Sequence, residues 1–380
     1  MKENWTYKKL GELCSITSGF TPKAEELSSF GKFPYFKVAD MNSLGNEVFL
    51  SLTDAYLCES KKFHPKGSVV FPKNGATIAT NKKRILKQDS IVDLNTAVAC
   101  FNNKIIDVKY SYYWFMNIDF KDYMRGGALP TLDIKSLKST LIPLPPLSIQ
   151  QSIVAELDEI NNLLQLKKKE LETFDKLAQS IFYEMFGDPV TNEKGWEVKK
   201  LGEIAEATIG LTYKPENVSE CGTIVLRSGN IQDSSLAFDD IVRVNSKIPE
   251  NKYVNEGDIL MCTRNGSFRL VGKVAVITKL QERMSYGAFM TIIRSNMNPY
   301  LFEYFKTPAF RDHLISGKTT TVNQITVKML NDVKLPVPSL SLQQVFADRN
   351  EAIEQQKEQV KASINKLEAL LASRMQYWFD

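Results

Sequence analysis

Histidine and cysteine are scarce in this sequence, and their scarcity restricts the chemistry that the chain can perform. The 380 residues include two histidines, His64 and His313, and five scattered cysteines without any C-x-x-C spacing. Because zinc sites are usually built from closely spaced cysteine and histidine side chains, we expect no metal site. An odd number of scattered cysteines is typical of reduced thiols in a cytoplasmic protein.

Long apolar runs and common catalytic motifs are also missing. No segment approaches the roughly 18 apolar residues of a membrane span, and Met1-Lys-Glu-Asn-Trp5 does not resemble a secretory signal peptide. There is no G-x-S-x-G and no G-x-G-x-x-G. Ser316–Thr319 resembles the end of a phosphate-binding loop, but Asp312 stands where that motif requires glycine. We therefore expect a cytoplasmic, non-catalytic protein with no cofactor of its own.

Two long segments with similar beginnings are the main positive feature. Pro143-Leu-Pro-Pro-Leu-Ser-Ile-Gln-Gln151 returns, with changes, as Pro336–Gln344. The prolines disfavour helix before the serine, and Ser148 or Ser341 can cap the first turn of a following helix. We expect one helix from Ser148 to Phe186, about 55–60 Å long at 1.5 Å per residue, and a second from Ser341 onward.

Apolar residues recur in both segments at alternating steps of three and four, which is the heptad pattern of a coiled coil. The first seam contains Ile153, Leu157, Ile160, Leu164, Leu171, Phe174 and Ile181, and the second contains Ile353, Val360, Ile364, Leu367 and Leu371. Lysine interrupts both seams, at Lys167 and Lys357. Two seams of matched length are most simply each other's partners; the alternative is that each helix packs on its own domain.

The repeat extends beyond the helices. Trp5–Glu12 returns as Trp196–Glu203, and Gly67–Gly75 resembles Gly257–Gly266, with Asn74-Gly75 matched to Asn265-Gly266. The order module, helix, module, helix gives the expected boundaries, which are 1–142, 143–188, 189–335 and 336–380.

Short apolar runs between turns predict modules of mixed α/β fold. Because the second helix begins on the second module, it must return toward the first for the seams to meet. We therefore expect a long antiparallel two-helix coiled coil, a pseudo-two-fold internal repeat, and Trp5 close to Trp378.

Basic side chains are concentrated in the modules. The net charge is +4 overall but −3 in residues 148–187 and −1 in residues 341–380, which leaves +8 for the modules. A basic surface on each of two linked modules suggests a polyanion such as DNA, although lysine-rich surfaces also keep proteins soluble.

Arg, Lys, Asn, Ser and Thr are the side chains that usually contact bases and phosphates. The candidate DNA-binding residues of these types lie in predicted loops: Lys37, Lys73, Asn74, Lys82, Lys83, Arg84 and Arg125 in the first module, and Arg227, Asn230, Arg264, Asn265, Ser267, Arg269, Lys318 and Thr319 in the second.

The doubled arrangement resembles the specificity subunits of type I restriction–modification systems. The resemblance rests on the motifs at 5–12 and 143–151, on their second copies at 196–203 and 336–344, and on their order along nearly the whole chain. It implies two target-recognition domains that each read one half of a bipartite double-stranded DNA target, with the helices fixing the gap. It also implies two methyltransferase subunits and ATP-driven restriction subunits as partners. S-adenosylmethionine, ATP and Mg²⁺ would then belong to those partners and not to this chain.

Two other functions stay open at this stage. The chain could be part of a stand-alone restriction enzyme with an unrecognised nuclease site, which Mg²⁺-dependent cleavage without partners would reveal. It could instead be a protein-binding coiled-coil adaptor, which the absence of salt-dependent affinity for duplex DNA would favour.

Overall fold

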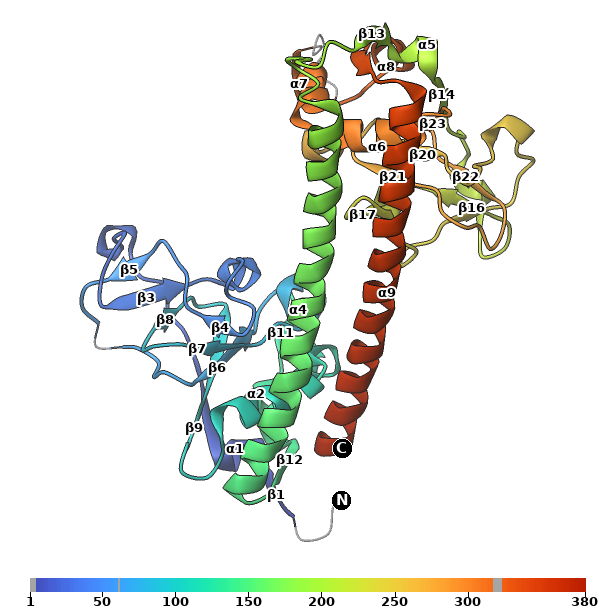
Figure 1. The fold of residues 1–380 in the computed structure, drawn as a ribbon. Coiled ribbons are helices and arrows are strands. Elements are labelled where there is room, and N and C mark those ends of the chain that lie inside the picture. Colours follow the sequence, from blue (N-terminus) through green and yellow to red (C-terminus); the bar gives the residue numbers. More distant parts are fainter. Residues whose placement is uncertain (1–4, 61, 317–322) are drawn as a thin grey trace. The chain divides into compact units, whose positions relative to one another are not determined.

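The structure, a computed structural model, describes residues 5–60, 62–316 and 323–380, and it divides into two units (Figure 1). Unit 1 consists of Met1–Lys168 and Ala362–Asp380, and unit 2 consists of Lys169–Lys361. Two long helices, α4 (Leu147–Phe186) and α9 (Leu340–Phe379), contribute one part to each unit. The expectation of two mixed α/β modules and two long helices is confirmed.

Unit 1 is built around a five-stranded sheet in the order β2-β9-β6-β7-β4, with a three-stranded sheet β5-β3-β8 and two antiparallel strand pairs, β1-β12 and the hairpin β10-β11. Helix α2 covers the larger sheet, and Trp114 and Phe115 on it are buried in the core. The helix begins where the Asp107 carboxylate accepts hydrogen bonds from the backbone N–H groups of Lys109 (2.9 Å) and Tyr110 (3.1 Å). Its elements are β1 (Thr6–Lys9), α1 (Leu10–Leu13), β2 (Cys14–Ser18), β3 (Phe33–Phe36), β4 (Phe49–Leu50), β5 (Tyr56–Leu57), β6 (Val69–Pro72), β7 (Arg84–Leu86), β8 (Ile91–Val92), β9 (Thr96–Phe101), α2 (Val108–Asn117), β10 (Met124–Arg125), β11 (Thr131–Leu132), α3 (Ile134–Ser139) and β12 (Leu141–Leu144).

Unit 2 repeats this plan with two four-stranded sheets, β14-β23-β20-β21 and β15-β19-β16-β22, and the pairs β13-β24 and β17-β18. Two consecutive helices, α6 (Asn298–Lys306) and α7 (Pro308–Ser316), are separated at Thr307. Its elements are β13 (Glu197–Lys200), α5 (Leu201–Ile204), β14 (Glu206–Ile209), β15 (Val218–Ser219), β16 (Thr223–Leu226), β17 (Ile231–Gln232), β18 (Ser235–Leu236), β19 (Arg243–Val244), β20 (Ile259–Cys262), β21 (Val274–Val276), β22 (Met284–Tyr286), β23 (Met290–Arg294), α6 (Asn298–Lys306), α7 (Pro308–Ser316), α8 (Val327–Asn331) and β24 (Lys334–Val337).

The proline-rich lead-ins to α4 and α9 are held in the same way in both units. The hydroxyl of Tyr110 donates to the carbonyl oxygen of Pro143 (2.8 Å), and the hydroxyl of Tyr300 donates to that of Pro336 (2.6 Å). The side-chain amide of Gln150 donates to the Pro145 carbonyl oxygen (2.8 Å), as Gln343 does to that of Pro338 (2.7 Å). Because proline offers only a carbonyl for hydrogen bonding, these four donors fix the direction in which each long helix leaves its module.

The predicted serine caps are wrong. Helix α4 begins at Leu147, so Ser148 lies inside the first turn, and the carbonyl oxygen of Pro146 accepts from the N–H of Gln150 (3.0 Å). In α9 the corresponding position is Ser339, whose carbonyl oxygen accepts from Gln343 (3.0 Å), and not Ser341.

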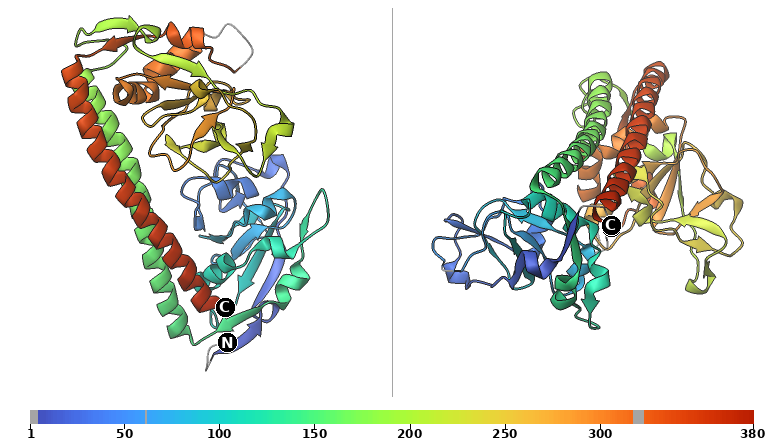
Figure 2. Two further views of the ribbon diagram at one scale, coloured as in Figure 1. Left: turned by 90° about the vertical axis from the view of Figure 1, so that its right-hand side faces the viewer. Right: turned by 90° about the horizontal axis from the view of Figure 1, so that it is seen from below.

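The two long helices are antiparallel partners in both units (Figures 1 and 2). In unit 1, Glu156 and Lys168 of α4 bind Arg374 and Glu368 of α9. In unit 2, Asp175 of α4 binds Lys357 of α9 (2.9 Å). Partner numbers fall along α9 as they rise along α4, which confirms the antiparallel arrangement. The predicted seam residues are buried or half-buried: Ile153, Leu157, Ile160, Leu164, Ile353, Val360 and Ile364 are buried, and Leu171, Phe174, Ile181, Leu367 and Leu371 are half-buried.

The end of α9 completes the core of unit 1. Met375 and Phe379 are buried beside Ile153 and Leu157, and the indole of Trp378 is stacked on that of Trp5, with the ring centroids 6.0 Å apart. The expectation that Trp5 lies near Trp378 is confirmed. In unit 2, Phe182 and Phe186 at the end of α4 have the matching place in the core.

Candidate nucleic-acid interface

Four loops of unit 1 meet around a cavity of about 580 Å³. Lys37 follows β3, Asn74 follows β6, Asn95 lies between β8 and β9, and Thr131 begins β11. All four residues line the cavity, and Lys37, Asn95 and Thr131 are exposed. Two of the predicted DNA-binding residues, Lys37 and Asn74, are therefore brought together.

Backbone hydrogen bonds hold the loops in place. The N–H of Lys73 donates to the carbonyl oxygen of Asn95 (2.8 Å), and the N–H of Gly75 donates to that of Pro130 (2.8 Å). Gly19 lies so close to the β8–β9 turn that an added Cβ would be 2.1 Å from the Val92 carbonyl oxygen. The cavity rim is thus a framework whose backbone is held by hydrogen bonds and close packing.

Unit 2 contains the same framework. The N–H of Thr263 donates to the carbonyl oxygen of Phe289 (2.9 Å), as Lys73 does to Asn95, and that of Asn265 donates to Asn323 (3.3 Å), as Gly75 does to Pro130. Gly210 takes the place of Gly19, since its added Cβ would be 2.2 Å from the Gly287 carbonyl oxygen.

These bonds correct the alignment of the repeat. Thr263 occupies the place of Lys73, Arg264 that of Asn74 and Asn265 that of Gly75. The sequence comparison had matched Asn265 to Asn74, because Asn-Gly occurs in both loops. The structural alignment of the two loops therefore differs by one residue from the alignment that the sequences suggest.

The two units place different side chains on this common frame. In unit 1, the Asn74 amide nitrogen donates to the side-chain oxygen of Asn95 (3.3 Å). In unit 2, the guanidinium carbon of Arg264 lies 5.0 Å from the ring centroid of Phe289, a cation–π distance. Sequence reasoning missed Asn95 and Phe289. Their only signal was a short polar or glycine-containing turn between two β-type runs.

The loops after β3 and β16 also correspond. The N–H of Lys37 donates to the Asp40 carboxylate (2.7 Å), and the N–H of Arg227 donates to the Asn230 side chain (2.8 Å). Lys37 is exposed, whereas Arg227 is half-buried and paired with Asp240 (2.8 Å).

Asn230 was predicted to contact DNA, but its position does not fit that role. It is 1% exposed, and its amide nitrogen donates to the carbonyl oxygens of Ala237 (2.9 Å) and Asp240 (3.0 Å). Because its polar groups are used inside the protein, Asn230 shapes the loop.

The basic cluster at residues 82–84 also does not lie at the cavity. Lys83 is fully buried, and its ammonium donates to the Ile118 carbonyl oxygen (2.6 Å) and to the Asn81 side chain (2.5 Å). Burial lowers the pKa of Lys83 to about 7. Arg84 donates to backbone carbonyls of Lys83 and Met41 (both 2.7 Å), and Lys82 binds Asn42. The sequence predicted a basic loop that enters a strand, and the strand, β7, begins at Arg84 and continues with the buried Ile85 and Leu86.

The remaining predicted residues have mixed positions. Lys73 donates to the Ser18 hydroxyl (2.6 Å), and Arg125, the last residue of β10, pairs with Asp133. Asn265 donates to the Ser228 hydroxyl (3.0 Å), which joins two loops of unit 2. Ser267 and Arg269, which follow Asn265 in the sequence, are exposed. Lys318 and Thr319 lie outside the described residues.

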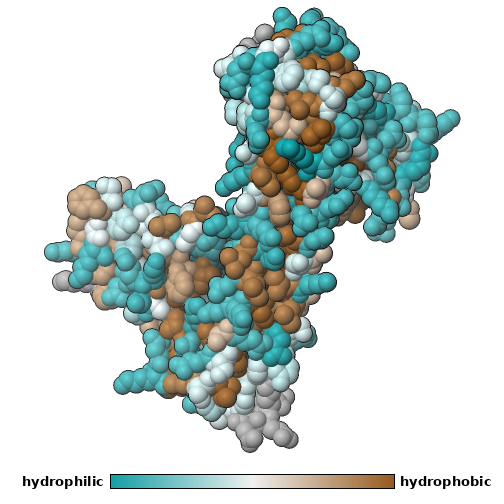
Figure 3. Space-filling model, in the orientation of Figure 1, coloured by the Kyte–Doolittle hydropathy of each residue, from teal (hydrophilic) through white to brown (hydrophobic). Residues whose placement is uncertain are grey.

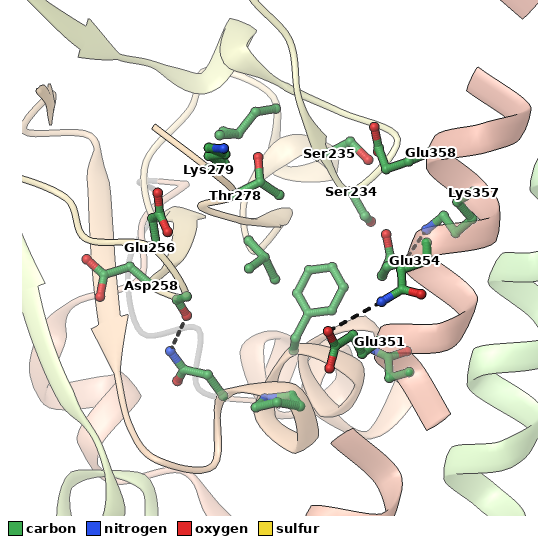
Figure 4. Close-up of a pocket in the computed structure, with 18 of the residues that line it drawn as sticks. Ser234, Ser235, Glu256, Asp258, Thr278, Lys279, Glu351, Glu354, Lys357 and Glu358 are labelled. Atoms are coloured by element: carbon green, nitrogen blue, oxygen red, sulfur yellow. Dashed lines mark hydrogen bonds and ion pairs between the residues drawn. The ribbon is translucent and has the colours of Figure 1, made fainter. Parts of the chain in front are cut away.

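A second cavity, of about 1610 Å³, lies in unit 2 between the module and α9 (Figure 4). Five carboxylates line it, Glu256, Asp258, Glu351, Glu354 and Glu358, together with four cations, Lys279, Arg294, Lys357 and Lys361. Three of these cations are paired with lining carboxylates. Since the lining has no excess of positive charge to attract a polyanion, the smaller loop-lined cavity is the better candidate for binding nucleic acid.

Among the residues that the structure describes, no three His, Cys, Asp or Glu side chains are grouped so that they could hold a metal ion. No helix of the described chain has the length and hydropathy that a membrane span requires.

Fold and loops together define a protein with two copies of one recognition framework, joined by a pair of antiparallel helices. The family model described as type I restriction modification DNA specificity domain matches residues 2–174 and 193–369. The chain therefore belongs to this family.

The type I restriction enzyme MjaVIII specificity subunit of Methanocaldococcus jannaschii is 24% identical over 97% of this chain and 92% of its own length. The type I restriction–modification S subunit from M. genitalium superposes with a TM-score of 0.54 at 16% identity, covering 100% of this chain and 98% of that one. A chain of a structure described as showing complex assembly and conformational transition of the type I R-M system gives 0.55 at 20%, covering 99% and 97%. These structural likenesses support the fold.

Proposed function

We propose that this protein is the DNA sequence-specificity subunit of a type I restriction–modification complex, in which each unit reads one half of a bipartite target. The observation that carries the proposal is the loop cluster of the family fold, present twice with different polar side chains. Asn74 belongs to the first cluster, and Arg264 belongs to the second. A shared frame with different reading side chains is what two different half-sites require.

Binding then has a sequence-blind part and a sequence-specific part. Exposed cations such as Lys37 neutralise phosphates, and this contribution falls steeply with salt. Side chains that reach base edges provide discrimination, about 1–3 kcal/mol for each good bidentate pair. The chain itself performs no catalytic step in this account, so methyl transfer and ATP-driven steps belong to partner subunits with their S-adenosylmethionine, ATP and Mg²⁺.

The helix pair would have two roles. As a coiled coil of fixed length, it would set the number of unread base pairs between the half-sites. It would also dock methyltransferase and restriction subunits, because α4 exposes apolar side chains on the side away from the seam. Figure 3 shows hydrophobic patches along this helix among hydrophilic ones, and the exposed residues include Leu163, Leu166 and Leu177.

The test is to express the chain with its methyltransferase partner in cells without other modification systems and to map the modified bases of the genome. A bipartite motif, two defined halves separated by a fixed number of unspecified bases, is the expected result. A continuous motif, or modification that does not depend on this chain, would contradict the proposal.

A further inference from the structure

The matched positions 74 and 264 carry side chains with different base preferences. The equivalence rests on backbone geometry and not on sequence similarity. Asn74 forms an isolated antiparallel β-bridge with Thr131 in unit 1, and Arg264 forms the equivalent backbone bridge with Gln324 in unit 2. The flanking bonds also match, since Leu132 donates to the Lys73 carbonyl oxygen (2.9 Å) and Ile325 to that of Thr263 (2.7 Å).

Each of these residues has a supporting side chain at a second matched position. The N–H of Gly19 donates to the Thr96 carbonyl oxygen (3.1 Å), and that of Gly210 donates to Met290 (3.0 Å). Asn95 and Phe289 immediately precede those acceptors, so they correspond. The pair Asn74–Asn95 in unit 1 therefore lies at the same position of the fold as the pair Arg264–Phe289 in unit 2.

In unit 1 the hydrogen bonding leaves Asn74 with one donor and one acceptor available. Its amide nitrogen has two N–H groups, and one of them donates to Asn95 (3.3 Å). The remaining N–H and the side-chain oxygen match the N7 acceptor and N6 donor that adenine presents in the major groove. The bond to Asn95 also restrains the Asn74 side chain at the edge of the cavity.

In unit 2 the available groups are all donors. Within residues 5–60, 62–316 and 323–380, the Arg264 guanidinium has no hydrogen-bond or ion-pair partner, whereas Arg227 pairs with Asp240 and Arg243 with Glu282. The guanidinium packs against Phe289, which is 55% exposed although it is a large apolar ring. Packing against the ring leaves the N–H groups at the edge of the guanidinium available, and two of them match the O6 and N7 acceptors of guanine.

We infer that position 74/264 is a specificity-determining position: Asn74, held by Asn95, reads an adenine in one half-site, and Arg264, held by Phe289, reads a guanine in the other. This inference rests on the proposed function and adds the base class at one position of each half. Asn95 and Phe289 act as positioning residues.

The experiment maps modified motifs for the complete complex, formed by the full chain and its methyltransferase partner. With Arg264→Lys, we expect one guanine of one half-site to become unspecified while the other half-site stays unchanged. Lysine keeps the positive charge but lacks the planar guanidinium that makes the bidentate contact with guanine. Discrimination at that base should therefore fall about 5- to 150-fold. Asn74→Ala should relax one adenine of the opposite half-site by a similar factor.

Positioning variants and a control separate base reading from folding. Phe289→Leu and Asn95→Ala should relax the same single bases as Arg264→Lys and Asn74→Ala, by smaller factors. Lys37→Ala, at an exposed cation of the same rim, should weaken modification of all sites evenly and leave the motif unchanged.

Two results would overturn the inference while the proposed function stands. One is an unaltered bipartite motif in the Arg264→Lys and Asn74→Ala complexes. The other is an even loss of modification at every site, which would make the two residues phosphate contacts. If the wild-type complex gives no bipartite motif at all, the proposed function fails first, and the two failures are therefore distinguishable.

Discussion

Phe379, next to the last residue of the sequence, should be among the strongest single contributors to the stability of unit 1. Its side chain is 6% exposed and packs in the core with Ile153 and Leu157, and its ring centroid lies 5.2 Å from that of Tyr110. Tyr110 in turn holds the Pro143 carbonyl oxygen at the start of α4. Phe379→Ala would remove a buried aromatic ring and leave a cavity, which costs about 3–5 kcal/mol. Against a typical unfolding free energy of about 5–15 kcal/mol, that is a large fraction.

Hydrogen exchange followed by mass spectrometry can assign this loss to one unit. We expect amides of β2, β6 and β9 to lose protection in Phe379→Ala, while those of β20 and β23 keep theirs. Phe186→Ala should do the reverse, because Phe186 is 3% exposed and its ring lies 5.0 Å from Tyr300 in unit 2.

Gln376→Ala is the matched control, since Gln376 is an exposed residue of the same helical turn, and it should change stability by less than about 0.5 kcal/mol. The reasoning is refuted if Phe379→Ala costs no more than the control, or if protection is lost in unit 2 instead.

Two further predictions concern Lys83 and the length of the helix pair. Burial lowers the pKa of Lys83 to about 7 in the folded chain, whereas the unfolded chain should have the ordinary value of about 10.4. Between these two pH values the unfolded chain binds more protons, so the free energy of unfolding should increase as the pH rises. The urea midpoint of Lys83→Met should lack this increase, and equal pH dependence of the two midpoints would show that Lys83 does not titrate in this range. Inserting one heptad into both α4 and α9 lengthens the coil by about 10 Å and should change or abolish the preferred gap between half-sites in a DNA-binding selection; recovery of the original gap would contradict the spacing role.

The long helices could be predicted from the sequence because their information is local. Heptad spacing and proline lead-ins depend only on residues within a few turns of each other, and the doubled order then required an antiparallel pair. The serine caps were misplaced by two residues at the same lead-ins, since Pro146 and Ser339 provide the first helical carbonyls. A proline-rich segment excludes helix upstream but does not fix the starting residue.

The loop cluster was only partly predictable, because it depends on which loops the sheets bring together. Lys37 and Asn74 were found by residue type, but Asn95 was missed because a lone asparagine in a turn is unremarkable. Lys83 shows the opposite error, since a basic run in a sequence does not reveal that one of its side chains turns inward between Ile118 and Phe120. The equivalence of Asn74 and Arg264 became visible only in the backbone hydrogen bonds of the structure, because the Asn-Gly dipeptide present in both loops had matched Asn74 to Asn265.

Exchange of one module tests the central claim most directly. Residues 1–142 would be replaced by the corresponding residues of a family member with a different target, and the modified motif would be mapped in cells that carry the methyltransferase partner. The account predicts a motif in which one half-site is new while the other half-site and the gap are retained. A motif in which both halves change, or in which neither does, would contradict the proposal that each unit reads its own half.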